Sequence, residues 1–186
     1  VRFETPLSLA VMVANKESDN SIAEHLFKHL GQSVMGVGSF EAASMAVESY
    51  IEDTLDIDTE GMVIRDGSGL SPSNRLTAGG VASVLFAMAH EPDETRDVFL
   101  RSLPVGGRDG TMAKRLTEGN YQGKVRAKTG YIRGAYALSG YVWTRMGRWL
   151  CFSILINAPP DGNRVPRYTA MKSVMDDVCR VLIDDY

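Results

Sequence analysis

Three strand-like segments follow one another closely in the second half of the chain, and they limit the possible folds more than any other feature. The segments span residues 124–131, 135–144 and 149–157, and Arg145-Met146-Gly147-Arg148 forms a turn between the last two. Two strands joined by so short a turn pair antiparallel. The third segment is the most apolar, so we expect it to be central in the sheet.

The chain ends in a second pattern, which indicates a helix. Apolar residues recur at helical spacing at Tyr168, Met171, Val174, Met175, Val178, Val181 and Leu182. This periodicity predicts an amphipathic helix, and we expect its apolar face to cover the sheet. The sequence Pro159-Pro160-Asp161-Gly162 is expected to separate this helix from the last strand, because proline and glycine interrupt both kinds of element.

The first half of the chain is predicted to be helical. A short apolar segment spans residues 7–14, and a periodic run follows Ser18-Asp19-Asn20 and is expected to end at Gly31. Ser39 is expected to cap a further helix, and residues 77–89 to form another. The residues expected to face inward are Ile22, Ala23, Leu26, Phe27, Leu30, Ala43, Val47, Tyr50 and Ile51. Helices followed by an antiparallel three-strand meander and a covering helix predict an α+β fold.

The composition is that of an ordinary globular protein and argues against two functional classes. The 186 residues are 44% hydrophobic and 23% charged, with a net charge of −3 and basic residues spread along the chain. Without a Lys/Arg cluster, nucleic-acid binding has no electrostatic support. No apolar run approaches the ~20 residues that span a bilayer. The sequence starts at Val1 without an initiator Met or a signal sequence, so we expect a fragment or a processed product.

Three short motifs carry residues suited to chemistry: Ser18-Asp19-Asn20, Asp66-Gly67-Ser68-Gly69-Leu70-Ser71 and Lys128-Thr129-Gly130. Each also has a purely structural interpretation. Ser, Asp and Asn cap helices, Gly-Ser-Gly forms tight turns, and Lys, Thr and Gly occur on edge strands and at bulges. The order S-D-N and then K-T-G, however, is that of serine acyl-transfer enzymes, whose remaining element is S-x-x-K.

Together with two neighbouring segments, these motifs resemble a known family. The stretches 15–20, 66–71, 103–111 and 125–130 are similar to those of the D-Ala-D-Ala carboxypeptidase/endopeptidase family of serine peptidases (family S13), the low-molecular-mass class C penicillin-binding proteins. The resemblance covers nearly the whole chain. It implies a β-lactamase/transpeptidase-like fold, of which residues 1–186 are the C-terminal part of one domain. It also implies a periplasmic or other extracytoplasmic location, peptidoglycan D-Ala-D-Ala peptides as substrates and β-lactams as ligands.

The resemblance further implies a reaction and a role for each motif residue. A serine attacks the carbonyl between two D-alanines, an acyl-enzyme forms, and water releases the product. Ser18 then lies in a proton relay to the leaving amine, and Asn20 binds the substrate amide.

The K-T-G motif is expected to bind the end of the substrate. Lys128 attracts the terminal carboxylate and tunes proton transfer, and Thr129 offers its hydroxyl to the same carboxylate. Gly130 allows close backbone approach, and the N–H of Tyr131 is an oxyanion-hole donor. The substrate is expected to lie along the edge of this strand.

One element of the family pattern is missing. Only Lys114 and Lys172 have a hydroxyl residue three positions before them, and these residues are Thr111 and Thr169. In the family, S-x-x-K precedes S-D-N, whereas both threonines follow it. We therefore expect the nucleophile to lie in an N-terminal part of the same protein, and we expect that part to be a partner of this chain. The chain alone is expected to be inactive and to expose an apolar face.

Three other functions stay open from the sequence. A β-lactamase-type hydrolase has the same site plan, and a non-catalytic module is a second alternative that retains the fold. A metal site is a third, because His25 and His29 lie four residues apart on one predicted helix. No nearby residue completes a ligand set, so we expect neither a metal nor a cofactor.

Overall fold

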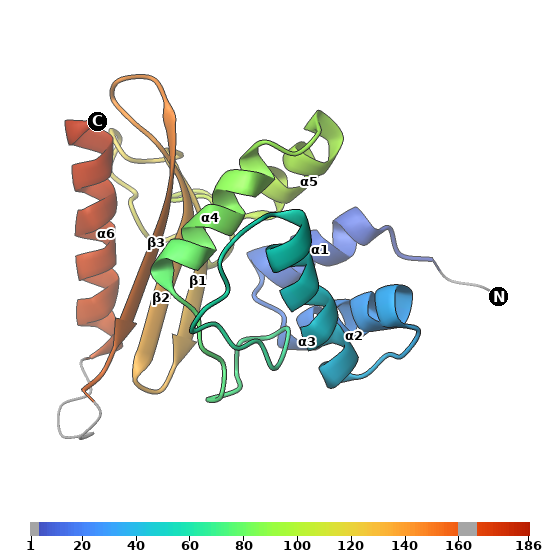
Figure 1. Ribbon diagram of the computed structural model, residues 1–186. Coiled ribbons are helices and arrows are strands. Elements are labelled where there is room, and N and C mark those ends of the chain that lie inside the picture. The colour runs from blue at the N-terminus through green and yellow to red at the C-terminus, as the bar shows by residue number, and fades with distance from the viewer. Residues whose placement is uncertain (1–3, 160–166) are drawn as a thin grey trace. The chain divides into compact units, whose positions relative to one another are not determined.

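The computed structural model describes residues 4–159 and 167–186, and it divides into two compact units, Val1–Ser102 and Leu103–Tyr186 (Figure 1). Unit 1 is helical, and unit 2 holds the sheet and the last helix. The predicted α+β class is therefore confirmed. Within the described ranges, no helix combines the length and apolarity that a membrane span requires. Residues 160–162 of the expected break lie outside the described residues.

Unit 1 is helical, and three of its helices begin at residues whose side chains cap them. Its elements are α1 (Leu7–Lys16), α2 (Asn20–Met35), α3 (Phe40–Ser49), the π-helical turn η1 (Tyr50–Thr54), α4 (Ala78–Ala89) and α5 (Asp93–Ser102). The side chains of Asp19, Ser39 and Thr77 accept hydrogen bonds from backbone N–H groups three residues later, at 2.9, 3.1 and 3.0 Å. Each cap satisfies a donor that the first helical turn leaves unpaired. Helix α5 was not predicted, since its sequence is mostly polar.

Two kinds of prediction in unit 1 are wrong. Helix α2 does not end at Gly31 but at Gly36, whose φ of +76° suits glycine. Gly31 is buried instead, because α3 approaches so closely that a Cβ there would meet the Ala43 nitrogen at 2.7 Å. Leu30 and Tyr50, which were expected to face inward, are exposed. Tyr50 lies at the start of the π-helical turn, where its hydroxyl donates to the carboxylate of Glu91 at 3.5 Å, so its polar end stays at the surface.

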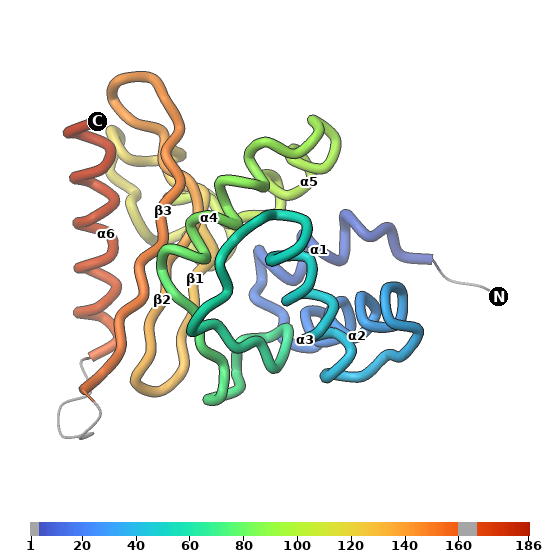
Figure 2. Tube along the Cα trace, viewed as in Figure 1, coloured from blue at the N-terminus to red at the C-terminus, as the bar shows by residue number. Residues whose placement is uncertain are grey.

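Unit 2 contains an antiparallel sheet of β1 (Val125–Ile132), β2 (Ala135–Trp143) and β3 (Trp149–Asn157). The three strands and their antiparallel pairing are as predicted. The expectation that the third strand is central is wrong, because the strand order in the described residues is β1-β2-β3. Short turns join β2 to both neighbours, so the meander places it between them. Figure 2 traces this path through β1, β2 and β3 to α6 (Tyr168–Asp185).

Helix α6 covers one face of the sheet, as predicted (Figure 1). The core between them includes Val125, Ala127, Leu138, Val142, Phe152, Met175, Cys179 and Ile183. The buried stripe of α6 repeats every four residues, at Met175, Cys179 and Ile183. As a consequence, Val174, Val178 and Val181, which were expected to face inward, are exposed. Cys151 and Cys179 are both free thiols.

Candidate active site

The outer edge of β1 is paired only over the first part of the strand. Val105 bridges Arg126, the Ala127 N–H donates to the Pro104 carbonyl at 2.9 Å, and the Gly106 N–H donates to the Val125 carbonyl at 2.9 Å. In the described part of unit 2, this pairing ends at Ala127. Segment 103–111 therefore covers the edge just up to the K-T-G motif.

Beyond Ala127, the edge presents backbone groups at every second residue. In an antiparallel sheet, the N–H and C=O of alternate residues point to the same side. Since Val125 and Ala127 use the outer edge, the backbone groups of Thr129 and Tyr131 point there as well. This edge has the geometry that an added peptide strand requires.

Lys128 brings a positive charge to this edge. Its Nζ donates to the carbonyl oxygen of Thr129 at 2.9 Å. Burial lowers the pKa of Lys128 from its ordinary value, because removal from water disfavours the charged ammonium. Successive strand side chains alternate between faces, so Lys128 lies on the face opposite the α6 core, which contains Ala127. Its side chain therefore reaches from that face to the strand edge.

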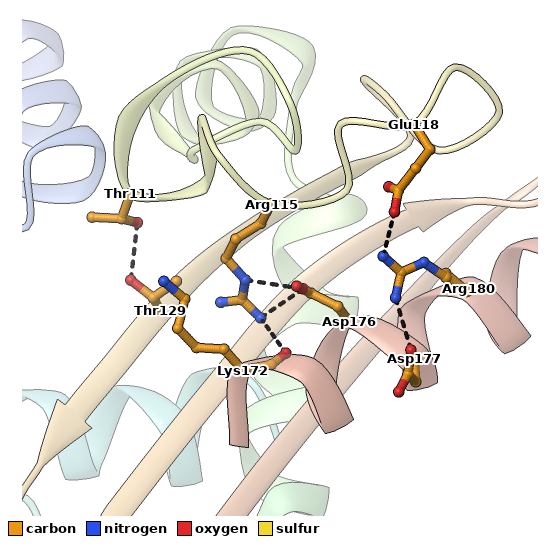
Figure 3. A network of polar contacts seen from close by, with 8 residues as sticks. All are labelled: Thr111, Arg115, Glu118, Thr129, Lys172, Asp176, Asp177 and Arg180. Carbon is orange, nitrogen blue, oxygen red and sulfur yellow. Dashed lines mark hydrogen bonds and ion pairs between the residues drawn. The ribbon is translucent and has the colours of Figure 1, made fainter. Parts of the chain in front are cut away.

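Thr129 lies on the α6 face of the strand and has a hydroxyl partner from another segment. The Thr129 hydroxyl donates to the Thr111 hydroxyl at 2.9 Å (Figure 3). In the sequence, Thr111 stands out only by its spacing to Lys114, and that spacing does not predict this contact. The signal available was that Thr111 belongs to the family-like segment 103–111.

Gly130 and Tyr131 complete the motif region. Gly130 pairs with Ala137, and a Cβ at position 130 would meet the Ala137 Cβ at 3.1 Å. A larger residue there would have to push against β2. The exposed ring of Tyr131 packs against Tyr136 and Tyr168, with ring centroids 5.4 and 4.5 Å apart. These aromatic contacts hold the end of β1 against the start of α6.

The S-D-N motif in unit 1 forms the link between α1 and α2. The capping interpretation is correct for Asp19, whose carboxylate accepts from the Ile22 N–H. Ser18 has a φ of +56°, in the left-handed region that non-glycine residues rarely adopt. Asn20 is the first residue of α2 and is exposed. Backbone strain of the kind seen at Ser18 is concentrated at functional sites.

Carboxylates organise the second motif beside α2. Glu24 accepts from the N–H groups of Gly67 and Ser68, at 2.9 and 3.4 Å. Asp66 accepts from the N–H groups of Gly69 and Ser71, at 2.8 and 2.6 Å. The loop therefore packs on α2 one turn beyond Asn20, and this role of Glu24 was not predicted from the sequence.

The histidines show no arrangement that suits a metal. The Nδ1 of His25 lies 2.7 Å from the Ser21 carbonyl oxygen, within its own helix. Among residues 4–159 and 167–186, no group of three His, Cys, Asp or Glu side chains is placed to hold an ion.

Comparison with known proteins identifies a family that matches nearly the whole chain. The model of the D-Ala-D-Ala carboxypeptidase 3 (S13) family matches residues 4–178. The chain is 40% identical over 147 residues to a D-alanyl-D-alanine carboxypeptidase of Actinomadura sp. (strain R39), which covers 76% of this chain and 27% of that protein. It is 36% identical over 151 residues to carboxypeptidase DacB of Mycolicibacterium smegmatis, which covers 78% of this chain and 33% of that protein.

A solved structure matches the fold. The chain is similar to penicillin binding protein 4 (dacB) from Haemophilus influenzae, complexed with a β-lactam, with a TM-score of 0.84 and 27% identity. The match covers 96% of this chain and 42% of that one. The expected penicillin-binding, transpeptidase-like fold is therefore confirmed. The chain spans about a quarter to a third of the length of the two curated relatives.

Proposed function

The chain belongs to the D-Ala-D-Ala carboxypeptidase 3 (S13) family, and we propose that it forms part of a serine-type D-Ala-D-Ala carboxypeptidase. The whole protein would cleave peptidoglycan stem peptides through an acyl-enzyme and would be acylated by β-lactams. The names of the Actinomadura and Haemophilus relatives support this proposal. Because peptidoglycan lies outside the cytoplasm, we also propose a periplasmic or other extracytoplasmic location.

The observation that carries the proposal is the β1 edge, where pairing stops at Ala127 and the K-T-G motif follows. A peptide added to this edge would pair with the outward backbone groups of Thr129 and Tyr131. The Lys128 ammonium would attract the terminal carboxylate, and the Thr129 hydroxyl would donate to it. The Tyr131 N–H would stabilise the oxyanion, and loss of such a donor typically lowers the rate by about 10²–10³.

Ser18 and Asn20 are proposed to serve the same reaction. Ser18 would take part in proton transfer to the leaving amine, and Asn20 would bind the substrate amide with its donor and acceptor groups. The lowered pKa of Lys128 supports a part in proton transfer as well, because a smaller pKa difference from the working pH favours exchange.

The nucleophile is proposed to come from a part of the protein outside these 186 residues. No S-x-x-K occurs in the sequence, and the chain spans 27% and 33% of the two curated relatives. Residues 1–186 would then be the C-terminal part of one penicillin-binding domain and would be inactive alone.

The proposal is tested by D-alanine release from a peptide that ends in D-Ala-D-Ala, with the full-length protein. We expect Lys128→Ala to lower kcat/KM by about 10² or more, since it removes both charge and proton transfer. Lys114→Ala is the matched control, because Lys114 is an exposed lysine in the same unit, and it should retain full activity. A full-length protein that releases no D-alanine would contradict the proposal, and rapid turnover of nitrocefin would instead identify a β-lactamase.

A further inference from the structure

We propose that Thr111 is a positioning residue that holds the Thr129 hydroxyl as a donor to the carboxylate at the end of the substrate. The inference rests on the proposed carboxypeptidase function of the K-T-G strand. The two hydroxyl oxygens lie 2.9 Å apart, and Thr111 comes from a segment 18 residues earlier in the chain (Figure 3).

The backbone around Thr111 is anchored independently of Thr129. Thr111 is the middle residue of the short 3-10 helix η2 (Gly110–Met112). The next residue, Met112, is fully buried in the core of unit 2. The Arg115 N–H donates to the Met112 carbonyl at 3.0 Å, which closes the turn. Thr111 is thus held in place by the core and not by its bond to Thr129.

A buried ion pair fixes the same turn to α6. The Nε and Nη2 of Arg115 lie 2.9 and 2.8 Å from the Asp176 carboxylate, and the Arg115 side chain is only 3% exposed (Figure 3). The Nη2 also donates to the Lys172 carbonyl at 3.4 Å. Arg115 therefore connects the segment that carries Thr111 with the helix that covers the sheet.

The chemistry of two adjacent hydroxyls explains what Thr111 does. Each hydroxyl has one hydrogen and two acceptor sites, so Thr129 can donate either to Thr111 or to a substrate carboxylate. An ionised carboxylate only accepts, and hence Thr129 turns its hydrogen toward it when substrate binds. Thr111 then donates to Thr129 and keeps its oxygen in place. Such a chain polarises the outer bond and strengthens it.

This arrangement favours substrates with a free C-terminal carboxylate. Hydrogen bonds to an ionised acceptor are roughly twice as strong as those to a neutral one. A peptide whose C-terminus is an amide offers only a neutral acceptor to Thr129, so it gains less from a well-held donor. Removal of the Thr111 hydroxyl should therefore weaken the binding of the carboxylate substrate more than the binding of the amide.

The test compares D-alanyl-D-alanine peptides with a free carboxylate and with a C-terminal amide, using the full-length protein. We expect Thr111→Val to lower kcat/KM for the carboxylate peptide about five- to tenfold, mainly through KM, and to change the amide peptide much less. Thr111→Ser should restore the wild-type ratio. Thr117→Val, at an exposed threonine six residues further along the chain, is the matched control and should leave both rates unchanged.

Two results overturn the inference alone: an active wild type whose carboxylate-to-amide ratio is unchanged by Thr111→Val, and an equal loss on both peptides, which would show a merely structural role. A wild-type protein that releases no D-alanine from either peptide overturns the proposed function together with the inference.

Discussion

Removal of one partner from the buried ion pair between Arg115 and Asp176 should destabilise unit 2, and Asp176→Ala is the change that tests it. The carboxylate accepts from Arg115 at 2.8 and 2.9 Å, and the two side chains are 3% and 13% exposed. After the substitution, the guanidinium remains buried, and of its hydrogen bonds to the described residues it keeps the 3.4 Å bond to the Lys172 carbonyl. The charge is then uncompensated in a place that water hardly reaches.

The magnitude follows from this burial. Removal of one partner of a buried pair typically costs about 3–5 kcal/mol. Because Asp176 keeps some contact with solvent, we expect about 3 kcal/mol, near the lower end of that range. The double change Arg115→Met with Asp176→Leu should recover most of the loss, since an apolar pair of similar volume is often neutral relative to a buried ion pair.

The neighbouring residue supplies a matched control. Asp177 pairs with Arg180 at 2.7 Å on the same helix, but the side chains are 66% and 28% exposed, and Arg180 also binds Glu118 at 2.8 Å. Asp177→Ala should cost only about 0–1 kcal/mol. Native-state hydrogen exchange of the α6 amides in the full-length protein measures the opening free energy in each variant. Equal losses for Asp176→Ala and Asp177→Ala would refute the reasoning.

Three further predictions concern Lys128, Cys179 and two helical glycines. Lys128→Met should raise the free energy of unfolding at pH 7 by about 0.5–2 kcal/mol, because burial lowers the pKa of Lys128 in the folded state. Denaturant titrations should show that this gain shrinks as the pH rises from the pKa of Lys128 in the folded state toward its pKa in the unfolded state. Over this range the folded wild-type protein loses the charge of the lysine, so burial no longer destabilises it. Burial raises the pKa of the Cys179 thiol to about 12, so a thiol reagent at pH 8 should modify Cys179 only after unfolding, as mass spectrometry would show. Gly31→Ala should destabilise the protein by about 1–3 kcal/mol, because the new Cβ would meet the Ala43 nitrogen. Gly79 is a helical position with open space around it, so Gly79→Ala should stabilise the protein by up to ~1 kcal/mol. Thermal denaturation of the two variants measures these opposite shifts.

Sequence patterns predicted the fold where the signal was local. The strand at residues 149–157 has the predicted bounds, because a turn before the apolar run and a proline pair after it mark both ends of the strand. Gly31 shows the opposite case, since its role depends on the approach of α3 and not on its neighbours in sequence. Periodicity predicted correctly that α6 is amphipathic but selected the stripe of Val178 in place of that of Cys179, because both stripes are apolar.

The site was predicted only as far as its motifs. The K-T-G residues were identified from their order after S-D-N, and the structure places them where the outer edge of β1 is no longer paired. The partner of Thr129 is 18 residues away and the partner of Arg115 is 61 residues away in the chain. Contacts over such separations depend on how the segments pack, and a single sequence carries no pattern for them.

The most direct test of the proposed function is to find the residue that penicillin acylates. The full-length protein is incubated with penicillin and digested, and mass spectrometry locates the modified peptide. We predict a single acylated serine outside these 186 residues, and loss of acylation when Lys128 is replaced by Ala. An acyl group on Ser18, on Thr111 or on any other residue of this chain, or no acylation at all, would contradict the assignment of these 186 residues as the substrate-binding part of the site.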